Sequence, residues 1–458
     1  MDINHCGYIV KVKELRAHPN ADKLYIATFF GNDTCVSIDT QVGDIGVYFP
    51  CDLQLSLEFC IANHLCRKLP DGTADTGYME VDKRNITAIR LRGERSDGLY
   101  LPISCFNYCY NDDASAYLKV GDIINEVNGH PICNKYIPRT NKQNKTNSPN
   151  VSKTRKHKDP IAPLFKEHID TAQLAYNLNA FKPGDLIEIT RKLHGTSARI
   201  GYLPVLKGYK RTLWDKITHK DGKPIYEYDY IDGTRRTLLT SYDGGFYGSN
   251  EFRKHFHEAI EGKLHQGESV YAEIVGFTDD GVPIMGSVSN KKTNDKAFIK
   301  QYGDMTTFSY GCSPTGYITY EDGSHEAIPK NDFYVYRMTL TTPEGYTVEY
   351  SPEYTRYRCE QMGVKFVPIE WRGYIPEHPA SENDDTITAG EWIMNKAEQY
   401  YDGPEPIDPQ HVREGVVVRL VDKPSFTAYK IKNFSFKCIE GIAVADTTPV
   451  DETIAEEL

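Results

Sequence analysis

The sequence has no run of about 18 consecutive apolar residues, so no membrane-spanning helix is expected. Its first residues lack a basic stretch followed by an apolar core, which argues against a secretory signal. The eleven cysteines are odd in number and include no CxxC pair, which favours free thiols over a zinc site or a disulfide framework. We therefore expect a cytoplasmic protein in a reducing compartment, with no transition-metal site and no membrane partner.

Positive charge is also in deficit, since 53 Lys and Arg residues stand against 64 Asp and Glu residues, a formal net charge of −11. That balance by itself argues against a partner made of nucleic acid. The distribution is uneven, however: residues 1–132 carry 12 basic and 18 acidic side chains, whereas residues 133–160 carry 8 basic and 1 acidic. Any surface for an anionic partner would have to be made locally, since the field of the whole molecule does not favour it.

The chain of 458 residues is long enough for two or three domains. Short apolar runs separated by Gly, Asn and Asp predict a small β-barrel or sandwich over residues 1–132. Residues 133–160 are nearly free of apolar side chains and predict a basic flexible linker, which could hold phosphates or act only as a solvated tether. Residues 161–446 form the main domain in this division, and residues 447–458 an acidic tail.

Residues 187–203, IEITRKLHGTSARIGYL, are the stretch around which the chain is organised. Two alternating apolar runs flank a short polar segment, which predicts strand, turn and strand. Lys192 lies at the turn, close to Gly195. A lysine in such a position can be a nucleophile when burial and nearby cations lower the pKa of its ammonium group. Taken alone, the same pattern is also typical of a solvated strand end.

Two later strands each carry one unusual side chain. In residues 270–277, Glu273 interrupts an apolar run, and a buried carboxylate is unfavourable unless it is paired or liganded. A glutamate on an edge strand is the alternative. In residues 333–337, Tyr336 could stack on a planar ligand, although an aromatic residue in a strand more often belongs to the core.

The C-terminal motifs combine a carboxylate with two lysines. Glu414 begins the β-branched run EGVVVR, where it could hold a divalent ion against phosphate oxygens. In YKIK, strand periodicity places Lys430 and Lys432 on one face, about 7 Å apart. Two such cations suit a phosphate group, whereas an exposed basic strand face is the alternative.

The motifs KLHGTS, YAEIVG, EGVVVR and YKIK occur in an order that resembles that of the covalent nucleotidyltransferases. The histidine at position 194 resembles the RNA ligases in particular, because DNA ligases and mRNA-capping enzymes usually have aspartate there. Residues 165–171 resemble the segment that precedes the nucleophile in RNA ligases. The resemblance implies an α+β fold over residues 161–446, with antiparallel sheets and flanking helices.

The N-terminal residues add a second resemblance. Residues 18–24 and 90–99 resemble parts of the OB-like domain that stands before the catalytic domain in one group of nick-sealing RNA ligases. OB barrels bind single strands through a basic groove and stacking aromatics. Candidates for such a face are Arg90, Arg92 and Arg95, which could equally be solvated arginines beside a turn.

The resemblance implies an ATP-dependent RNA ligase that joins 3′-hydroxyl and 5′-phosphate ends through lysyl-AMP and adenylylated RNA. Lys192 would be the nucleophile, and Glu414 would hold Mg²⁺ or Mn²⁺. The RNA partner would be a nicked duplex or broken ends, and the protein is expected to act as a monomer. The other implied site residues are Lys430 and Lys432 at the α-phosphorus, Glu273 at the ribose or metal, Tyr336 on the purine, and His194 and Gly195 as nucleotide contacts, with His194 in a positioning or pyrophosphate-contacting role.

Some features depart from the family pattern. Arg191 stands where an acidic residue often precedes the nucleophile, and Arg235, Arg236 and Arg253 are only candidates for the basic motif that follows it. Residues 207–239 and 370–410 have no counterpart that we can name. Two alternatives therefore stay open: a capping-type guanylyltransferase, which shares the covalent lysine, and a non-catalytic RNA-binding relative of the ligases.

Overall fold

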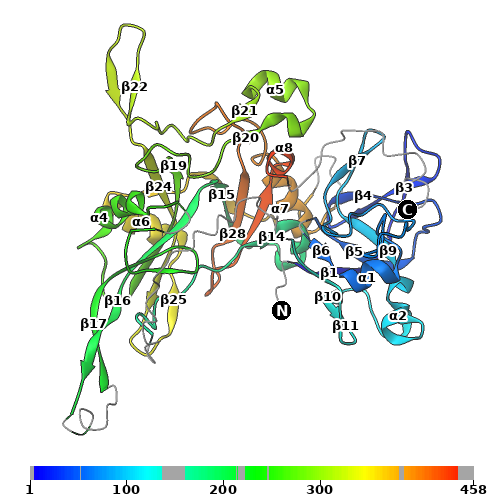
Figure 1. The fold of residues 1–458 in the computed structure, drawn as a ribbon, viewed down its shortest axis with the longest axis horizontal. Coiled ribbons are helices and arrows are strands. Elements are labelled where there is room, and N and C mark those ends of the chain that lie inside the picture. Colours follow the sequence, from blue (N-terminus) through cyan, green and yellow to red (C-terminus); the bar gives the residue numbers. More distant parts are fainter. Residues whose placement is uncertain are drawn as a thin grey trace.

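The computed structural model describes residues 5–51, 53–136, 160–212, 214, 222–244, 247–380 and 386–441, with only the backbone of Arg90 and Arg95. An N-terminal part, drawn in blue and cyan in Figure 1, lies beside a larger part that contains two extended sheets. Within these residues no helix is long and apolar enough to cross a membrane. Most of the expected linker and the whole of the expected acidic tail lie outside the described residues.

The N-terminal part consists of short strands around its own core. A four-stranded sheet in the order β10-β1-β5-β9 and a three-stranded sheet in the order β2-β3-β4 carry most of it. Alternating apolar residues in these strands are buried together with the short helix α1 (Leu57–Ala62). The strands and the second helix are β1 (Gly7–Lys11), β2 (Arg16–Ala17), β3 (Leu24–Phe29), β4 (Asn32–Ser37), β5 (Ile45–Phe49), β6 (Leu53–Leu55), β7 (Ile89–Leu91), β8 (Glu94–Ser96), β9 (Leu99–Pro102), β10 (Ile123–Ile124), β11 (Glu126–Val127), β12 (His130–Pro131), β13 (Cys133–Lys135) and α2 (Asn107–Tyr110).

The all-β character expected for residues 1–132 agrees with these strands, whereas the OB-like barrel stays a prediction. In the described part of residues 1–136 the strands divide among five small sheets, and no single ladder closes on itself. The start expected for the linker differs from the structure. Residues 133–135 form β13, which pairs with β6, and Cys133 is fully buried. Residues 133–135 therefore belong to the N-terminal fold, because Cys133 is buried in its core.

The first large sheet has the order β14-β29-β28-β15-β27. Strand β15, which lies between β28 and β27, is buried on both faces, because α7 packs on one side and the site lies on the other. All neighbouring strands are antiparallel except β14 and β29. The bounds are β14 (Ala172–Gln173), β15 (Leu186–Lys192), β27 (Ile369–Tyr374), β28 (Gly415–Leu420), β29 (Ala428–Lys432) and α7 (Ala389–Glu398).

The second large sheet has the order β18-β17-β16-β19-β24-β25, and β26 pairs with β24. Helices α4 and α6 cover an apolar face of this sheet, and their buried side chains share one core with β16, β19 and β24. The bounds are β16 (Thr196–Lys210), β17 (Lys223–Gly233), β18 (Leu238–Leu239), β19 (Glu268–Gly276), β24 (Asn331–Thr341), β25 (Thr347–Glu349), β26 (Lys365–Phe366), α4 (Lys254–Ile260) and α6 (Pro352–Met362).

Local sequence signals explain where the helices begin and end. Helix α6 begins after Ser351, whose side chain accepts the Tyr354 N–H, and ends at Gly363 in the left-handed conformation. Helix α7 begins with a capping box of Thr388 and Glu391. The remaining elements are β20 (Val288–Ser289), α5 (Lys296–Tyr302), β21 (Met305–Thr306), β22 (Tyr317–Thr319), β23 (His325–Ala327) and α8 (Phe434–Ile439).

Candidate active site

The turn between β15 and β16 joins the two large sheets. The strand–turn–strand prediction is confirmed, because β15 ends at Lys192 and β16 begins at Thr196. The turn lies tightly against β19: a Cβ atom on Gly195 would come within 2.2 Å of the carbonyl oxygen of Ile274. Only glycine fits at this contact, so the backbone of the turn that carries Lys192 packs directly against the backbone of β19.

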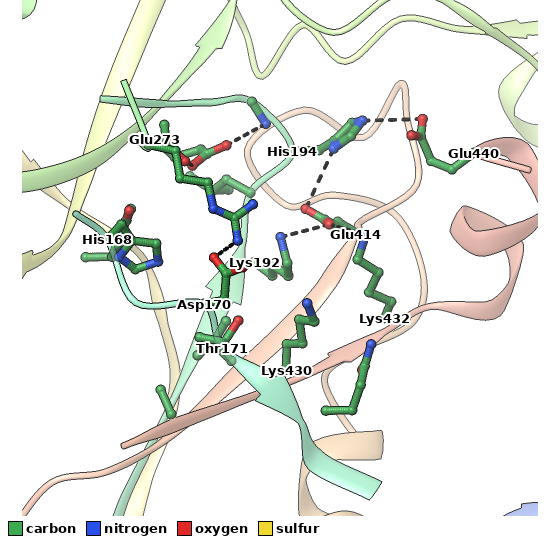
Figure 2. A pocket seen from close by; sticks show the side chains of 18 of the residues that line it. His168, Asp170, Thr171, Lys192, His194, Glu273, Glu414, Lys430, Lys432 and Glu440 are labelled. Atoms are coloured by element: carbon green, nitrogen blue, oxygen red, sulfur yellow. Dashed lines mark hydrogen bonds and ion pairs between the residues drawn. The ribbon is translucent and has the colours of Figure 1, made fainter. Parts of the chain in front are cut away.

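Strand register brings Glu414 to Lys192. In the first sheet Lys192 is opposite Gly415, and Gly415 is opposite Lys432. Glu414 therefore stands at the end of three neighbouring strands, where its Oε1 lies 2.8 Å from Lys192 Nζ and 3.1 Å from Lys432 Nζ. Figure 2 shows these side chains converging with Lys430 on one wall of the pocket.

The electrostatics of this cluster favour an ionised carboxylate. Burial by itself would raise the pKa of Glu414, but the ammonium groups of Lys192 and Lys432 outweigh burial and hold that pKa at about 2. Lys430 faces the opposite balance: burial first, and then the charges of Lys192 and Lys432, lower its pKa to about 8. The site thus places three lysines around one carboxylate, an arrangement that an anion such as a phosphate would stabilise.

Glu273 contacts the turn from β19. Its Oε1 accepts the Gly195 N–H at 3.2 Å, and its Oε2 accepts the Ser197 hydroxyl at 3.4 Å. Burial raises the pKa of Glu273 to about 7, so the carboxyl group changes its charge near neutral pH. Glu273 lies in β19, which pairs with β16 on one side and β24 on the other, so the alternative of an edge strand is wrong. Its assignment to the ribose or metal stays a prediction.

His194 is enclosed between two carboxylates and two aromatic rings. Its Nδ1 lies 3.9 Å from Glu414 Oε2, and its Nε2 lies 3.3 Å from Glu440 Oε1 (Figure 2). The imidazole meets the rings of Phe308 and Phe436 edge-on, at centroid distances of 4.6 and 4.8 Å. These contacts fit the positioning role expected for His194, because the ring connects the turn to α8.

The far end of the pocket is aromatic. Tyr336 on β24 lines it, and the ring of His168 meets the Tyr336 ring edge-on at 5.0 Å. Burial, followed by the charges of Arg337 and Arg235, lowers the pKa of His168 to about 3, so this imidazole is neutral at pH 7. An aromatic end opposite a cluster of lysines suits a nucleotide with its base at one end and its phosphates at the other.

The pocket has a volume of about 470 Å³ and includes residues that sequence reasoning missed. One wall comes from the N-terminal part, through Asn85, Thr87 and Lys135. The sequence contains no periodic signal for these three residues, since they reach the pocket from segments far from the motifs in the chain. Arg235, one of the candidates for the basic motif, also lines the pocket and forms an ion pair with Asp170 of residues 165–171 (Figure 2).

The other basic candidates have different environments. Arg253 is buried, and its guanidinium donates to the Ser197 carbonyl and the Thr196 hydroxyl at 2.8 Å each, so it supports the turn from behind. Arg236 is largely exposed and lies 3.6 Å from Asp170. Arg191 is buried in ion pairs with Glu370 and Glu405, at 2.7 and 3.0 Å.

The N-terminal arginines lie on or beside the β7–β8 hairpin. Arg90 pairs with Arg95 along the backbone, but their side chains are outside the description. Arg92 occupies the turn with a φ of 44° and donates to the Asn20 carbonyl at 3.2 Å. The segments that resemble an OB domain therefore contact each other, while RNA binding by these arginines stays a prediction.

The side chains of the site could bind a divalent ion only if a bound ligand supplied some of the oxygen atoms that coordinate it. Among the described residues, no group of three or more His, Cys, Asp or Glu side chains could hold a metal ion by itself. Glu414 is nevertheless ionised, and its Oε2 is buried without a hydrogen-bond partner. Such an oxygen could bind Mg²⁺ or Mn²⁺ if phosphates and water supply the other ligands.

Comparisons with known proteins identify the family and the fold. Residues 185–439, more than half of the chain, match the family described as RNA ligase. A mutant of Naegleria gruberi RNA ligase with ATP and Mn is similar in fold, with 15% sequence identity and a TM-score of 0.52. The structure of the same ligase with PPi has 17% sequence identity and a TM-score of 0.54. Each of the two alignments covers 94% of this chain and 97% of the other. Curated proteins gave no significant match. The expected α+β fold is thereby confirmed, and the chain belongs to the RNA ligase family.

Proposed function

We propose that this RNA ligase uses ATP and forms a covalent lysyl-AMP at Lys192. The observation that carries the proposal is the cluster of Lys192, Lys430 and Lys432 around Glu414 at one end of a pocket whose other end is aromatic. Solved structures of the similar Naegleria gruberi enzyme with ATP, AMP or PPi support a nucleotide as the ligand of this pocket.

The reaction would proceed through three nucleotidyl transfers. The Lys192 ammonium group loses its extra protons to water as its nitrogen forms a bond to the α-phosphorus of ATP, and the bond between that phosphorus and pyrophosphate breaks. The AMP then passes to the 5′-phosphate of the RNA, which frees the lysine. Finally a 3′-hydroxyl forms the phosphodiester bond, and AMP leaves with the electrons of the broken anhydride bond.

The neighbouring side chains have separate roles in this scheme. Lys430 and Lys432 neutralise charge on the α-phosphate while its bonds change. Tyr336 stacks on the purine, and Glu273 contacts the ribose while it holds the turn through Gly195. His194 keeps the turn in place through Glu414 and Glu440.

Glu414 would hold a divalent ion, Mg²⁺ or Mn²⁺, through the buried oxygen that has no hydrogen-bond partner. Such an ion supplies additional neutralisation of phosphate charge. Glu273 is the second candidate ligand. Because burial raises its pKa to about 7, binding of a cation there would release a proton near neutral pH.

The proposed substrate is RNA with a nick in a duplex or with broken ends. A complementary strand holds the 3′-hydroxyl next to the 5′-phosphate, and such positioning can replace binding energy that the enzyme would otherwise have to supply. Joining rates on a nicked duplex should therefore exceed those on unpaired strands with the same ends. Equal rates would contradict this part of the proposal.

A monomer in a reducing, cytoplasmic compartment completes the proposal. All eleven cysteines are free, and nine of them are buried. Light scattering after size exclusion would test the monomer, and titration of the denatured protein should detect every thiol. A dimer or missing thiols would contradict these two points.

The deciding experiment is incubation with α-labelled ATP and Mg²⁺ or Mn²⁺, followed by denaturing electrophoresis of the wild type and Lys192→Ala. We expect a labelled band from the wild type alone, which pyrophosphate removes. Label from GTP instead of ATP would indicate a capping-type guanylyltransferase. Label from neither nucleotide would indicate a non-catalytic relative.

A further inference from the structure

We infer that the outer part of the β16–β17 hairpin binds the phosphate backbone of duplex RNA beside the break. We define this arm as residues 203–210 of β16 and 223–229 of β17. Strand β16 pairs with β19 only from Thr196 to Gly201, and beyond that point it pairs only with β17. The arm projects from the body of the molecule at the lower left of Figure 1. The inference rests on the proposed function, because it assigns a surface to the RNA partner.

The arm is too distant to serve the nucleotide pocket. Strand β16 begins four residues after Lys192 and runs without a break to Lys210. At about 3.3 Å per residue, the tip of the strand lies about 45 Å from its start. A partner that reaches both the nucleophile and the tip must be an extended polymer, and duplex RNA that flanks a nick has that form.

The charge of the arm is opposite to that of the whole chain. The arm as defined carries Lys207, Lys210 and Lys223 against Glu227 and Asp229, a net charge of +1, whereas the chain as a whole has a net charge of −11. Near the body, Lys207 is neutralised by an ion pair with Asp229. At the outer end, no ion pair of Lys210 or Lys223 occurs among the described residues, and both side chains are exposed.

The pairing of these two lysines is unfavourable unless an anion is present. Lys210 lies directly opposite Lys223 in the antiparallel ladder. Like charges in that arrangement destabilise a hairpin through their mutual repulsion. A phosphate backbone would remove the repulsion and gain counterion release at the same time. The arrangement is therefore best explained by a polyanionic partner.

The arm is also stiff enough to hold a rigid partner. An isolated two-stranded hairpin is only marginally stable in water. Here the rings of Tyr202 and Tyr230 stack at 4.9 Å near the base of the arm. Farther out, the Leu206 N–H donates to the Ile161 carbonyl at 2.8 Å, so residues 160–165 cover part of the arm. These contacts hold the inner part of the arm against the body of the molecule.

A second hairpin, formed by β22 and β23, has the opposite charge. Its exposed tip carries Glu321, Asp322 and Glu326, and it projects at the upper left of Figure 1. These carboxylates repel a phosphate backbone. Of these two projecting hairpins, the β16–β17 arm is therefore the one whose charge favours RNA.

The test is Lys210→Glu, with Lys296→Glu on α5 as a control of equal charge change. In the arm, the new glutamate would face Lys223 and form an attractive cross-strand pair, so the variant should be at least as stable as the wild type. Lys296 is exposed at the start of α5, away from the arm in Figure 1, and glutamate suits a first helical turn.

We would measure binding of a fluorescent nicked RNA duplex between about 50 and 200 mM salt, thermal unfolding, and lysyl-AMP formation. Lys210→Glu should weaken duplex binding about tenfold and flatten the salt dependence, with unchanged lysyl-AMP formation. Wild-type affinity in Lys210→Glu, or an equal loss in Lys296→Glu, would overturn the inference. Absence of lysyl-AMP in the wild type would instead contradict the proposed function. Because duplex binding is measured separately, a failure of the proposed function can be told apart from a failure of this inference.

Discussion

At the scale of single residues, the site depends on how buried charges are balanced. Glu414 keeps a pKa of about 2 although it is almost fully buried, because Lys192 and Lys432 lie within 3.1 Å. Lys430 has no carboxylate partner of this kind, and its pKa is lowered to about 8. Glu414 should therefore keep its negative charge at neutral pH, whereas Lys430 should lose its positive charge as the pH rises above about 8.

Glu414→Gln should lower the free energy of unfolding by about 1–3 kcal/mol at pH 7, because it leaves buried ammonium groups without a counter-charge. The folded-state pKa of Glu414 lies below its ordinary value of 4.5, so its stabilisation is present above pH 4.5 and is lost as the pH falls towards 2. The difference between variant and wild type should shrink over that range. Chemical denaturation measures it, with the exposed Glu360→Gln as control, and equal stability of Glu414→Gln and wild type at pH 7 would refute the account.

Lys430→Arg should change the pH dependence of ATP use. The ammonium group of Lys430 is charged below its pKa of about 8 and neutral above it, so the KM for ATP in lysyl-AMP formation should rise as the pH passes 8. Arginine remains charged over the whole range. The KM of the variant should stay flat between about pH 7 and 9.5, and parallel profiles for the two proteins would show that Lys430 does not provide the charge.

At the scale of secondary-structure elements, the turn between β15 and β16 sets the position of the nucleophile. It is held by three contacts: the packing of Gly195 on Ile274 of β19, the hydrogen bond to Glu273 of the same strand, and Arg253 from the segment before α4. The strand register of both sheets ends at this turn. A small displacement of the turn should therefore affect catalysis more than folding.

Gly195→Ala tests that position. The added Cβ would clash with the backbone of Ile274, so the turn must move away from β19 and carry Lys192 with it. Lysyl-AMP formation should fall by about 100-fold, since a shift near 1 Å at a reacting group has effects of that size. Gly286→Ala is a matched control, because no atom lies within 4 Å of its added Cβ. Comparable activity of both variants would show that the turn tolerates movement.

At the scale of the whole molecule, the pocket is complete only when the N-terminal part is in place. Asn85, Thr87 and Lys135 contribute one of its walls. The contact between the two parts includes Tyr176, whose ring stacks on Tyr8 at 5.2 Å and meets Phe30 edge-on at 5.6 Å. Tyr176 also lines the pocket, so loss of this contact should change nucleotide binding both through the pocket wall and through the packing of the two parts.

Tyr176→Ala should remove about 2–3 kcal/mol of packing between the two parts. We expect a larger radius of gyration in small-angle scattering and a KM for ATP that is raised severalfold. Tyr176→Phe keeps the ring and should behave like the wild type in both measurements. A compact Tyr176→Ala protein with normal ATP use would show that the N-terminal wall does not depend on this contact.

Sequence patterns predicted the residues that belong to strands or to turns beside them. Lys192, Glu414, Lys430 and Lys432 all lie in or next to β15, β28 and β29, where alternation and motif order are visible in the sequence. The strands around Glu273 and Tyr336 were predicted for the same reason. Arg253 was considered as a ligand contact, but burial behind the turn gives it a supporting position.

The sequence by itself determined the chemistry of this protein, because local alternation, a glycine turn and the order of charged motifs are properties of short segments. The tertiary structure alone decided the environment of that chemistry. It brought His168, Glu440 and Lys135 to one pocket, and it placed Lys210 opposite Lys223 on a projecting arm. Such contacts join segments far apart in the chain, and their burial and charge balance depend on the packing of both sheets, which no short segment encodes.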